Sequence, residues 1–344
     1  MLVFLSASVF SSEASHMTVS SPVLTPLHQP RIAAIDGGGT KTLLAVVGRD
    51  GSLGPVLRGA GSNPFDQAGW QDVLQSLLGQ LPSTTAALSL GLAGYEETRV
   101  LGREQSEVVE NAFAGPFSIC SDVEMACTGA FAGEAGVLIL SGTGSVAWAT
   151  DGRGGQVKIG GWGGLFGDEG SGFWIGRQAL ALLTALLDGR NQADHAFFAP
   201  FVAAMGLPTE KAACGTALLE WYGTLRHPRA SVASLARIVS DLAEGGLEPA
   251  RRLMREAADH LCAHIEAAQR HFPETSLPWS YAGGTFQSRF LRESIALRYG
   301  APVPPRLPPV GGGLLNAARL AGWDVDDAWI ERVSVALRDA GLTS

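Results

Sequence analysis

The 344 residues include 46% hydrophobic and 17% charged residues, a composition typical of a folded globular protein with ample core. The formal net charge of −8, from 25 basic and 33 acidic residues, argues against nucleic acid as the main partner, because such proteins carry a clustered basic face. The chain is longer than one compact core usually holds, so we expect two lobes.

The N-terminal residues and the cysteines indicate where the protein is located. Leu2–Phe10 is a short apolar run without the preceding Lys or Arg of a signal peptide. We interpret residues 1–30 as a disordered or misassigned extension, with Met17 as an alternative start. No later run reaches the roughly 18 apolar residues of a membrane span, so we expect no membrane partner. Unpaired cysteine spacing favours a reducing compartment, here the cytoplasm; the cysteines are Cys120, Cys127, Cys214 and Cys262.

A glycine-rich turn joins the first two predicted strands. It runs from Asp36 to Thr42, between the apolar runs Ile32–Ile35 and Leu43–Val47. We expect its glycines to supply positive φ and bare backbone N–H groups, which form a concavity suited to phosphate. The alternative is a plain hairpin turn. The spacing of a Walker loop is not met.

Short strands and helices alternate after this turn, which predicts an α/β lobe over residues 31–132. Its further elements are a strand at Pro55–Ala60, a helix at Asp66–Leu81, a strand at Ala86–Leu92, a helix from about Glu97 to Ala112, a strand at Phe117–Cys120 and a helix at Val123–Ala132.

The same order begins again near Gly133, which suggests duplication of one α/β unit. A strand at Val137–Leu140, a glycine turn at Ser141–Ser145 and a strand at Val146–Thr150 open a second lobe, predicted over 133–325 with a helical insertion. Later elements are helices between Ser171 and His271, the longest at Pro249–Phe272, a strand end and turn at Tyr281–Phe286, and a helix from Pro309. Asp326 or Asp327 caps a final helix, 326–344, which could join the first lobe.

Three polar residues follow strand ends or glycine turns, and each has a structural alternative. Asp122 could be a general base or the N-cap of the following helix. Asn63 could bind a ligand or form an Asx turn before Pro64. Asp168 could bind a ligand or cap the helix from Ser171.

The order of these motifs resembles the N-acetylglucosamine kinase branch of the BadF/BadG/BcrA/BcrD-type ATPases. The resemblance spans about residues 31–320 and is most specific over Gly160–Ala179. It implies a two-lobe actin-like, hexokinase-like ATPase fold, with duplicated ribonuclease-H-like units around a central cleft. The motifs are Asp36–Thr42, Gly61–Asn63, Ser121–Asp122, Ser141–Ser145, Gly160–Gly163, Gly167–Ser171, Gly283–Thr285 and Pro309–Gly313.

The resemblance implies a site for ATP and Mg²⁺. The β- and γ-phosphates would meet the first turn at Gly38, Gly39, Thr40 and Lys41. The second turn, Gly142-Thr143-Gly144, would close over them from the other lobe. Gly283 and Gly284 would lie against the adenosine, and Asp36 would help to hold Mg²⁺. Phosphoryl transfer needs such donors and a cation more than covalent chemistry.

The resemblance also implies a sugar site with Asp122 as general base. The other residues that would contact the sugar are Asn63, Ser145, Gly161, Trp162, Gly163 and Asp168. Trp162 could instead be core. Kinases of the mammalian type have Asn and His where this chain has Val146 and Gly164. Both differences fall near the sugar pocket, so they concern the identity of the sugar more than the chemistry.

We therefore expect an ATP-dependent kinase of an amino sugar, N-acetylglucosamine phosphorylated on O6, with glucosamine or another hexosamine derivative as the alternative. A dehydratase-activating ATPase would need cluster-ligating cysteines, which the scattered cysteines do not favour. A sugar sensor without catalysis is a further alternative. Because the family has dimeric members, the resemblance implies a homodimer. Nothing in the sequence itself tests this prediction.

Two weaker patterns point elsewhere. Gly142-x-Gly144-x-x-Ala147 imitates a dinucleotide fingerprint, but that motif requires a helix next and we expect a strand. His260 and His264 are four residues apart on a predicted helix and could face a metal, although the intervening Glu of H-E-x-x-H is absent.

Overall fold

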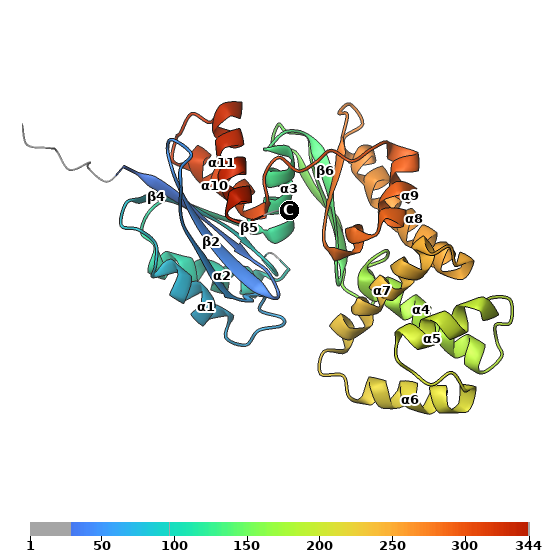
Figure 1. The fold of residues 1–344 in the computed structure, drawn as a ribbon. Coiled ribbons are helices and arrows are strands. Elements are labelled where there is room, and N and C mark those ends of the chain that lie inside the picture. The colour runs from blue at the N-terminus through green and yellow to red at the C-terminus, as the bar shows by residue number, and fades with distance from the viewer. Residues whose placement is uncertain (1–28, 96, 343–344) are drawn as a thin grey trace, which may run out of the picture.

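The computed structural model describes residues 29–95 and 97–342. The predicted extension over 1–30 therefore lies outside the described residues, except for its last two. Within the described ranges the strands form two sheets, one of five strands and one of four. Figure 1 shows them in two lobes, with α3 between them.

The first sheet has the order β3-β2-β1-β4-β5. β1, β2 and β3 are antiparallel, whereas β4 and β5 run parallel to β1. The predicted strands are confirmed to within two residues at each end. Their bounds are β1 Arg31–Gly37, β2 Lys41–Gly48, β3 Leu53–Ala60, β4 Thr85–Leu92 and β5 Phe117–Ser121.

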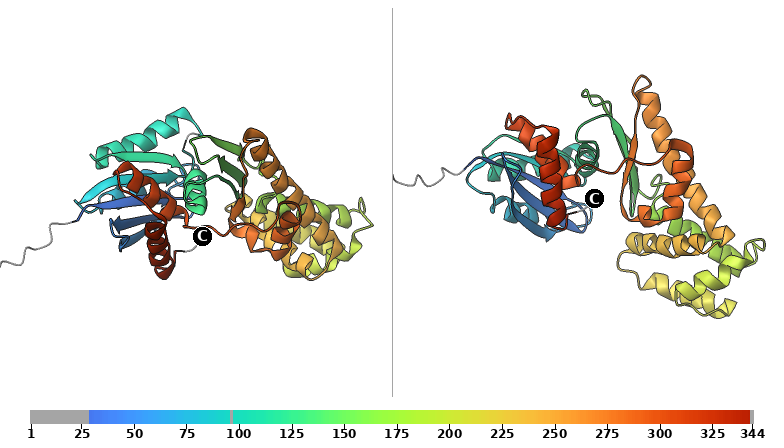
Figure 2. Two further views of the ribbon diagram at one scale, coloured as in Figure 1. Left: turned by 90° about the horizontal axis from the view of Figure 1, so that it is seen from above. Right: turned by 45° about the horizontal axis from the view of Figure 1, so that its top comes forward.

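Helices cover both faces of this sheet. Successive side chains of a strand point to opposite faces, so Ala33 and Ile35 of β1 pack with α1 and α2, while Ile32 and Ala34 pack with α10 and α11. Figure 2 shows the two helix pairs on opposite sides of the sheet. The helices are α1 Trp70–Leu78, α2 Arg99–Ala112, α3 Asp122–Phe131, α10 Pro309–Leu320 and α11 Asp327–Asp339.

The second sheet repeats the first through its first four strands. Its order is β8-β7-β6-β9, antiparallel through β6 and with β9 parallel to β6. The duplication suggested by the sequence is thus confirmed in the topology. The strands are β6 Gly136–Ser141, β7 Ser145–Thr150, β8 Gln156–Gly160 and β9 Trp279–Ala282.

The second lobe carries the helical insertion. Its largest apolar cluster joins the β6–β7 face with Trp174, Ile175, Val239 and Leu261. The helices are α4 Gly172–Leu187, η1 His195–Phe197, α5 Phe198–Ala204, α6 Lys211–Gly223, α7 Pro228–Glu244, α8 Glu248–His271, η2 Gly284–Gln287 and α9 Arg289–Tyr299. In this described part of the chain, no helix combines the length and the apolar character that crossing a membrane requires.

The helix α3 connects the two lobes. Val123, Ala126 and Ala130 pack against Leu138 and Trp148 of the second sheet, and the same helix packs along α10 and β4 of the first lobe. One end of α3 therefore lies where the two halves of the molecule meet.

The predicted boundary at 325 is corrected by the packing of α10. The sequence assigned this helix to the second lobe, but Val310, Leu314 and Leu315 lie in the apolar cluster of the first sheet. The chain has already returned at residue 307, because the Leu307 N–H donates to the Gly129 carbonyl. The glycines at 311–313 let α10 pack closely against α3 and β1. The local sequence pattern did not reveal this contact.

The helix predicted over Asp66–Leu81 is shorter in the structure. It begins at Trp70, because the N–H groups of Asp66 and Gln67 donate to the Asn63 carbonyl in a preceding turn. The predicted cap of the last helix is confirmed, with the Asp326 side chain accepting from the Trp329 N–H at 2.7 Å.

Close backbone contact between α3 and α10 generates a stability prediction. A Cβ atom on Gly312 would collide with the Met125 carbonyl oxygen and would lie 2.5 Å from the Gly129 nitrogen. Gly312→Ala should therefore force the helices apart and lower the free energy of unfolding by about 1–3 kcal/mol, measured by urea denaturation.

The matched control is Gly215→Ala in the middle of α6, where an added Cβ meets nothing within 4 Å. Helix propensity alone should make this variant more stable by about 0.5–1 kcal/mol. Equal effects of the two substitutions would contradict the close-packing explanation.

Candidate active site

The first glycine turn is a tight connection between β1 and β2. Gly37 pairs with Thr42, and the Gly38 N–H donates to the Lys41 carbonyl at 3.0 Å. The expectation of positive φ is wrong, since no residue of this turn has it. Glycine is needed here for space: a Cβ on Gly37 would lie 2.9 Å from a methyl carbon of Leu92. Thr40 and Lys41 are exposed beside it.

Two carboxylates lie at the same edge of the first sheet. Asp36 is in register with Gly91 of β4, which is in register with Cys120 of β5, and Asp122 follows the end of β5. Burial, reinforced by the Asp122 carboxylate and opposed by the Lys41 ammonium, raises the pKa of Asp36 to about 7. The two side chains are thus close enough to repel each other when both are ionised.

The capping alternative for Asp122 is wrong. The N-cap of α3 is Ser121, whose hydroxyl accepts from the Glu124 N–H at 3.2 Å. Asp122 is the first helical residue, and its carboxylate accepts from the Val123 N–H at 2.8 Å. Burial raises the pKa of Asp122, with the Val123 N–H and the Lys158 ammonium acting in the opposite direction. Lys158 belongs to β8, so a charge of the second lobe acts on this carboxylate.

Asn63 lies against the first turn and adopts the predicted Asx turn. Its Oδ1 accepts from the Phe65 N–H at 3.1 Å, and its Nδ2 donates to Oδ2 of Asp66 at 2.8 Å. A Cβ on Gly39 would lie 3.4 Å from the same Asp66 oxygen. Asp66 was not among the predicted site residues. Its N–H donates to the Asn63 carbonyl at 3.1 Å, so it belongs to the same turn region.

The second glycine turn is held against the start of α4. The Gly172 N–H donates to the Gly142 carbonyl at 2.8 Å, and the Phe173 N–H to the Thr143 carbonyl at 3.3 Å. The Thr143 side chain is exposed. The Ser145 hydroxyl donates to the Glu169 carbonyl at 2.7 Å, so Ser145 is engaged with the loop that precedes α4.

Asp168 is buried and is not the cap of α4. That cap is Ser171, which accepts from the Trp174 N–H at 3.1 Å. Oδ1 of Asp168 accepts from the Ser145 N–H at 3.2 Å, and Oδ2 accepts from Nη2 of Arg229. Both carboxylate oxygens are therefore bound to protein groups. Nothing in the local sequence marks Arg229, which is 61 residues away along the chain.

The loop between β8 and α4 places its aromatic residue outside the core. Trp162 is 71% exposed, and Leu165 and Phe166 are exposed beside it. The core alternative for Trp162 is therefore wrong. Gly161 is linked to the second turn by its N–H, which donates to the Ser145 carbonyl at 3.1 Å. Gly163 has open space where a side chain would be.

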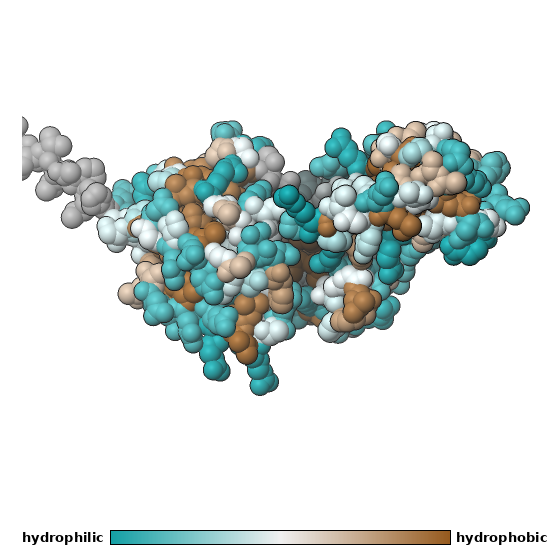
Figure 3. All heavy atoms as spheres, turned by 90° about the horizontal axis from the view of Figure 1, so that it is seen from below, coloured by the Kyte–Doolittle hydropathy of each residue, from teal (hydrophilic) through white to brown (hydrophobic). Residues whose placement is uncertain are grey.

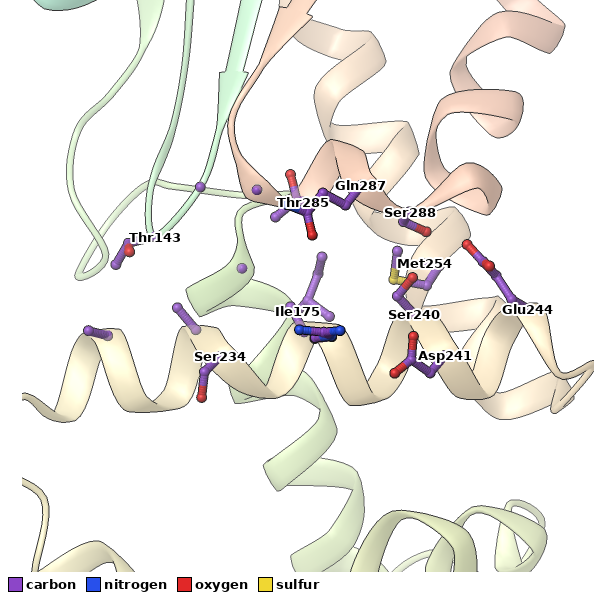
Figure 4. A pocket seen from close by; sticks show the side chains of 17 residues that line it. Thr143, Ile175, Ser234, Ser240, Asp241, Glu244, Met254, Thr285, Gln287 and Ser288 are labelled. Carbon is purple, nitrogen blue, oxygen red and sulfur yellow. The ribbon is translucent and has the colours of Figure 1, made fainter. Parts of the chain in front are cut away.

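A cavity of about 630 Å³ lies in the second lobe. Figure 4 shows Thr143 at one end and Glu244 at the other, with α7 along one side and Thr285 and Gln287 opposite. Gly284 lines it, but Gly283 does not. Gly283, with a φ of 101° and its backbone against the Ser141 carbonyl, shapes the turn instead. The helix α7 also lines the cavity, which the sequence did not predict. Its lining residues include Ala233, Ser234, Arg237, Ser240 and Asp241.

The structure thus divides the predicted site between the lobes. Asp36, the first turn, Asn63 and Asp122 lie on the first lobe, and the second turn, Asp168, Gly161–Gly163 and the cavity lie on the second. The first turn does not line the 630 Å³ cavity. Figure 3 shows the recess between the two lobes from below.

The donor set fits a magnesium ion that arrives with a nucleotide. Mg²⁺ is usually held by one or two carboxylates together with phosphates and water. Asp36 supplies one carboxylate for such an ion, and a divalent cation would also relieve its repulsion by the nearby Asp122 carboxylate. Across residues 29–95 and 97–342, no group of three or more His, Cys, Asp or Glu side chains forms a complete metal site.

The two weaker sequence patterns gain no support. The residues after the second turn form β7, not the helix of a dinucleotide fold. His264 is buried with Nδ1 2.9 Å from the His260 carbonyl oxygen, and burial lowers its pKa. A metal at these two histidines would find no third ligand of those types within the described ranges.

The chain is similar to known proteins over most of its length. The model of the BadF/BadG/BcrA/BcrD ATPase family matches residues 34–309. The N-acetylmuramic acid/N-acetylglucosamine kinase of Clostridium acetobutylicum is 27% identical over 245 residues, covering 69% of this chain and 78% of that protein. The N-acetyl-D-glucosamine kinase of Dictyostelium discoideum is 25% identical over 277 residues, covering 74% and 85%.

A solved structure is similar over nearly its whole length. It is a protein provisionally named an N-acetylglucosamine kinase, from Chromobacterium violaceum. The TM-score is 0.66 and the identity 26%, covering 85% of this chain and 99% of that one.

The exposed hydroxyl of Thr143 generates a prediction about nucleotide binding. If this group donates to a phosphate, Thr143→Val removes a hydrogen bond to a charged group, worth about 1.5–3 kcal/mol. Calorimetry should then show weaker binding of AMPPNP by about 10- to 100-fold. Thr216→Val on α6, outside the cavity lining, is the control and should bind normally. Unchanged binding by the Thr143 variant would count against the second turn as a phosphate site.

The raised pKa of Asp36 generates a prediction about pH. A carboxyl with a folded-state pKa above its unfolded value holds its proton more tightly when folded, so stability falls as pH rises from about 4 to 7. Asp36→Asn should therefore stabilise the protein at pH 8 in EDTA and have little effect at pH 4. Since one pKa unit corresponds to about 1.36 kcal/mol, a rise from 3.8 to about 7 limits the gain to about 4 kcal/mol. Urea denaturation at both pH values measures it, and equal gains would contradict this explanation.

Proposed function

Because the chain belongs to the BadF/BadG/BcrA/BcrD ATPase family, we propose that it is an ATP-dependent sugar kinase that phosphorylates an amino sugar. The observation that carries this proposal is the position of Asp122. Its carboxylate lies at the edge of the first sheet near Asp36 of β1, and the charge of Lys158 from the second lobe lowers its pKa against the effect of burial. A substrate held between the lobes would reach it.

N-acetylglucosamine, phosphorylated on O6, is the substrate we propose. Both curated relatives carry N-acetylglucosamine in their names. Glucosamine or another hexosamine derivative is the alternative, because Val146 and Gly164 differ from the pattern of kinases of the mammalian type. A Cβ on Gly161 would lie 3.0 Å from Val146, and one on Gly164 would lie 3.4 Å from Arg229, which bonds to Asp168. Both positions would therefore affect which sugar fits.

The nucleotide would lie along the second lobe with its phosphates toward the first. Adenosine would occupy the 630 Å³ cavity against Gly284, with Gly283 shaping the turn behind it. Gly142, Thr143 and Gly144 would contact the phosphates from one side, and Gly38, Gly39, Thr40 and Lys41 from the other. Bare backbone N–H groups and a Lys charge are donors that suit phosphate.

The reaction requires one proton transfer and one phosphoryl transfer. The sugar hydroxyl oxygen forms a bond to the γ-phosphorus, the bond from that phosphorus to the β,γ-bridging oxygen breaks, and ADP leaves. The Asp122 carboxylate accepts the hydroxyl proton, a contribution of about 10²–10⁴-fold. Burial raises the pKa of this carboxyl above its usual range, which brings it nearer to that of an effective base at neutral pH.

Asp36 would hold Mg²⁺ through water. Bound with the nucleotide, the ion would neutralise part of the charge on the transferred phosphoryl group. Lys41, whose charge already lowers the pKa of Asp36, would add a second positive charge on the same side.

The sugar would be bound from both lobes. Asn63 would contribute from the first lobe after leaving its present bond to Asp66. Ser145, Gly161, Trp162, Gly163 and Asp168 would form the wall on the second lobe. The exposed Trp162 ring is available to lie against an apolar face of the sugar. Closure of the two lobes would then exclude water from the γ-phosphate.

The two rival functions are less compatible with the residues. A dehydratase activator would need accessible cysteines for an iron–sulfur cluster, whereas Cys127, Cys214 and Cys262 are buried in apolar clusters. A sensor without catalysis would not need a carboxylate at position 122.

We also propose that the protein is a homodimer and that it is located in the cytoplasm. Light scattering after gel filtration would measure the first.

A screen of hexoses and hexosamines for ADP release tests the proposed function. N-acetylglucosamine should give the highest kcat/KM, and mass spectrometry and phosphorus NMR should identify a 6-phosphate. Turnover of glucosamine above its N-acetylated form would favour the alternative. ATP hydrolysis unaffected by every sugar would contradict the kinase proposal.

Asp122→Asn separates the proposed base from the structure of α3. Ser121 caps this helix, so the variant should keep its melting temperature and most of its sugar affinity. It should lose two or more orders of magnitude in kcat.

The control for this variant is Ser121→Ala, which removes the cap and should lower stability by about 1 kcal/mol while leaving kcat nearly unchanged. Near-normal turnover by Asp122→Asn would exclude it as the base.

A further inference from the structure

A guanidinium group lies at the end of the second phosphate turn. Arg229 is in the first turn of α7, next to Ala230, which lines the cavity. A Cβ atom on Gly144 would lie 2.9 Å from Nη2 of Arg229, and one on Gly164 would lie 3.4 Å from its Nε. The guanidinium therefore lies between the phosphate turn and the loop proposed to bind the sugar.

Asp168 holds this group in place. Its Oδ2 accepts from Nη2 of Arg229, while Oδ1 accepts from the Ser145 N–H. The aspartate side chain is 3% exposed and the arginine side chain 51% exposed. Asp168 also has a φ of 61°, a left-handed conformation that is uncommon for a residue other than glycine. One buried carboxylate thus fixes both the backbone of the turn and the cation beside it.

The remaining donors of Arg229 are available to a ligand. A guanidinium has five N–H donors in a rigid fork, and its bond to Asp168 uses one of them. Half of the side chain is open to solvent. A fork of this kind matches two oxygens of a phosphate, which a Lys ammonium does not.

We propose that Arg229 is a further catalytic residue that contacts the γ-phosphate of ATP, and that Asp168 is the positioning residue that holds its guanidinium there. The inference rests on the proposed kinase function. During transfer, negative charge spreads over the equatorial oxygens of the phosphoryl group. A guanidinium already oriented by a buried carboxylate stabilises that charge without reorganising.

The first test measures binding and needs no sugar. In the presence of Mg²⁺, calorimetry gives the dissociation constants of ADP and AMPPNP, which differ by the γ-phosphate. Arg229→Gln should weaken AMPPNP by about tenfold or more and leave ADP unchanged. An unchanged ratio of the two constants would overturn the proposal, even if the chain phosphorylates an amino sugar.

The second test measures turnover with the sugar found in the screen. Arg229→Gln should lower kcat by about 10²–10³-fold with little change in the KM of the sugar, and Arg229→Lys should recover part of the loss. Arg226→Gln is the control. This variant removes the same charge at a position three residues before Arg229. The Arg226 side chain is exposed and forms no salt bridge within residues 29–95 and 97–342, so the variant should behave as wild type.

Asp168→Asn distinguishes a positioning role from a direct sugar contact. If Asp168 positions Arg229, the variant should lose the preference for AMPPNP over ADP, as Arg229→Gln does. If it binds only the sugar, the KM of the sugar should rise while the nucleotide ratio stays normal, which contradicts the positioning role.

A double variant, Arg229→Gln with Asp168→Asn, is the control for loss of folding. Arg229→Gln alone leaves a buried carboxylate without its ion pair, which lowers stability, whereas Arg229→Gln with Asp168→Asn removes both charges. Its loss of AMPPNP preference should match that of Arg229→Gln alone, because the two residues act as one unit. Additive losses would contradict this coupling. If the wild type prefers AMPPNP but phosphorylates no sugar, the kinase proposal fails while the role of Arg229 in binding the γ-phosphate is still decided.

Discussion

The close packing of α3 against α10 is the contact on which the rest of the site depends. Gly129 and Gly312 bring the two backbones together, and a Cβ on Gly313 would meet the Met125 side chain and Ala34 of β1. This contact fixes α3 against the first sheet, while Val123 and Ala126 pack against the second. Since Asp122 is the first residue of α3, the same packing fixes the carboxylate between the lobes.

Charge is distributed unequally between the two lobes. The first carries Asp36 and Asp122, whose pKa values burial raises, with Lys41 beside them. The second presents Lys158 toward Asp122, and Arg229 on Asp168. An anionic nucleotide with a divalent cation would balance these groups when the lobes approach, because each then finds an opposite charge at short range. Each lobe alone offers only part of such a site.

The duplicated topology explains why each lobe has a glycine turn at the same position. In both lobes the turn joins the first two antiparallel strands, and the sheets repeat the same order. The lobes differ in what covers them. The first turn lies beside Asn63 and Asp66, whereas the second lies beside α4 and α7 of the helical insertion, which supply the cavity. Duplication therefore supplies two glycine turns, and helices of the insertion line the cavity beside the second one.

Local pattern was sufficient for most of the elements, and the resemblance to a known family supplied most of the candidate site residues. Apolar periodicity predicted the five strands of the first sheet to within two residues at each end, because burial of one face or both is a local property of the sequence. It did not predict β8. Glycine turns and strand ends marked Asp36 and Asp122, since such positions expose backbone donors and side chains at a sheet edge. The roles of Thr143 and Gly284 came from the resemblance to a known family. The sequence also suggested the duplication, from the repeated order of strand, turn and strand.

Only the tertiary structure decided which of these residues meet and what holds them. It placed the cap of α3 on Ser121 and that of α4 on Ser171, which frees Asp122 and Asp168 from that role. It assigned α10 to the first lobe and joined Arg229 to Asp168 across 61 residues. Such pairings depend on how distant segments pack. Neither spacing nor composition contains that information, because the groups involved are neighbours only after the chain has folded.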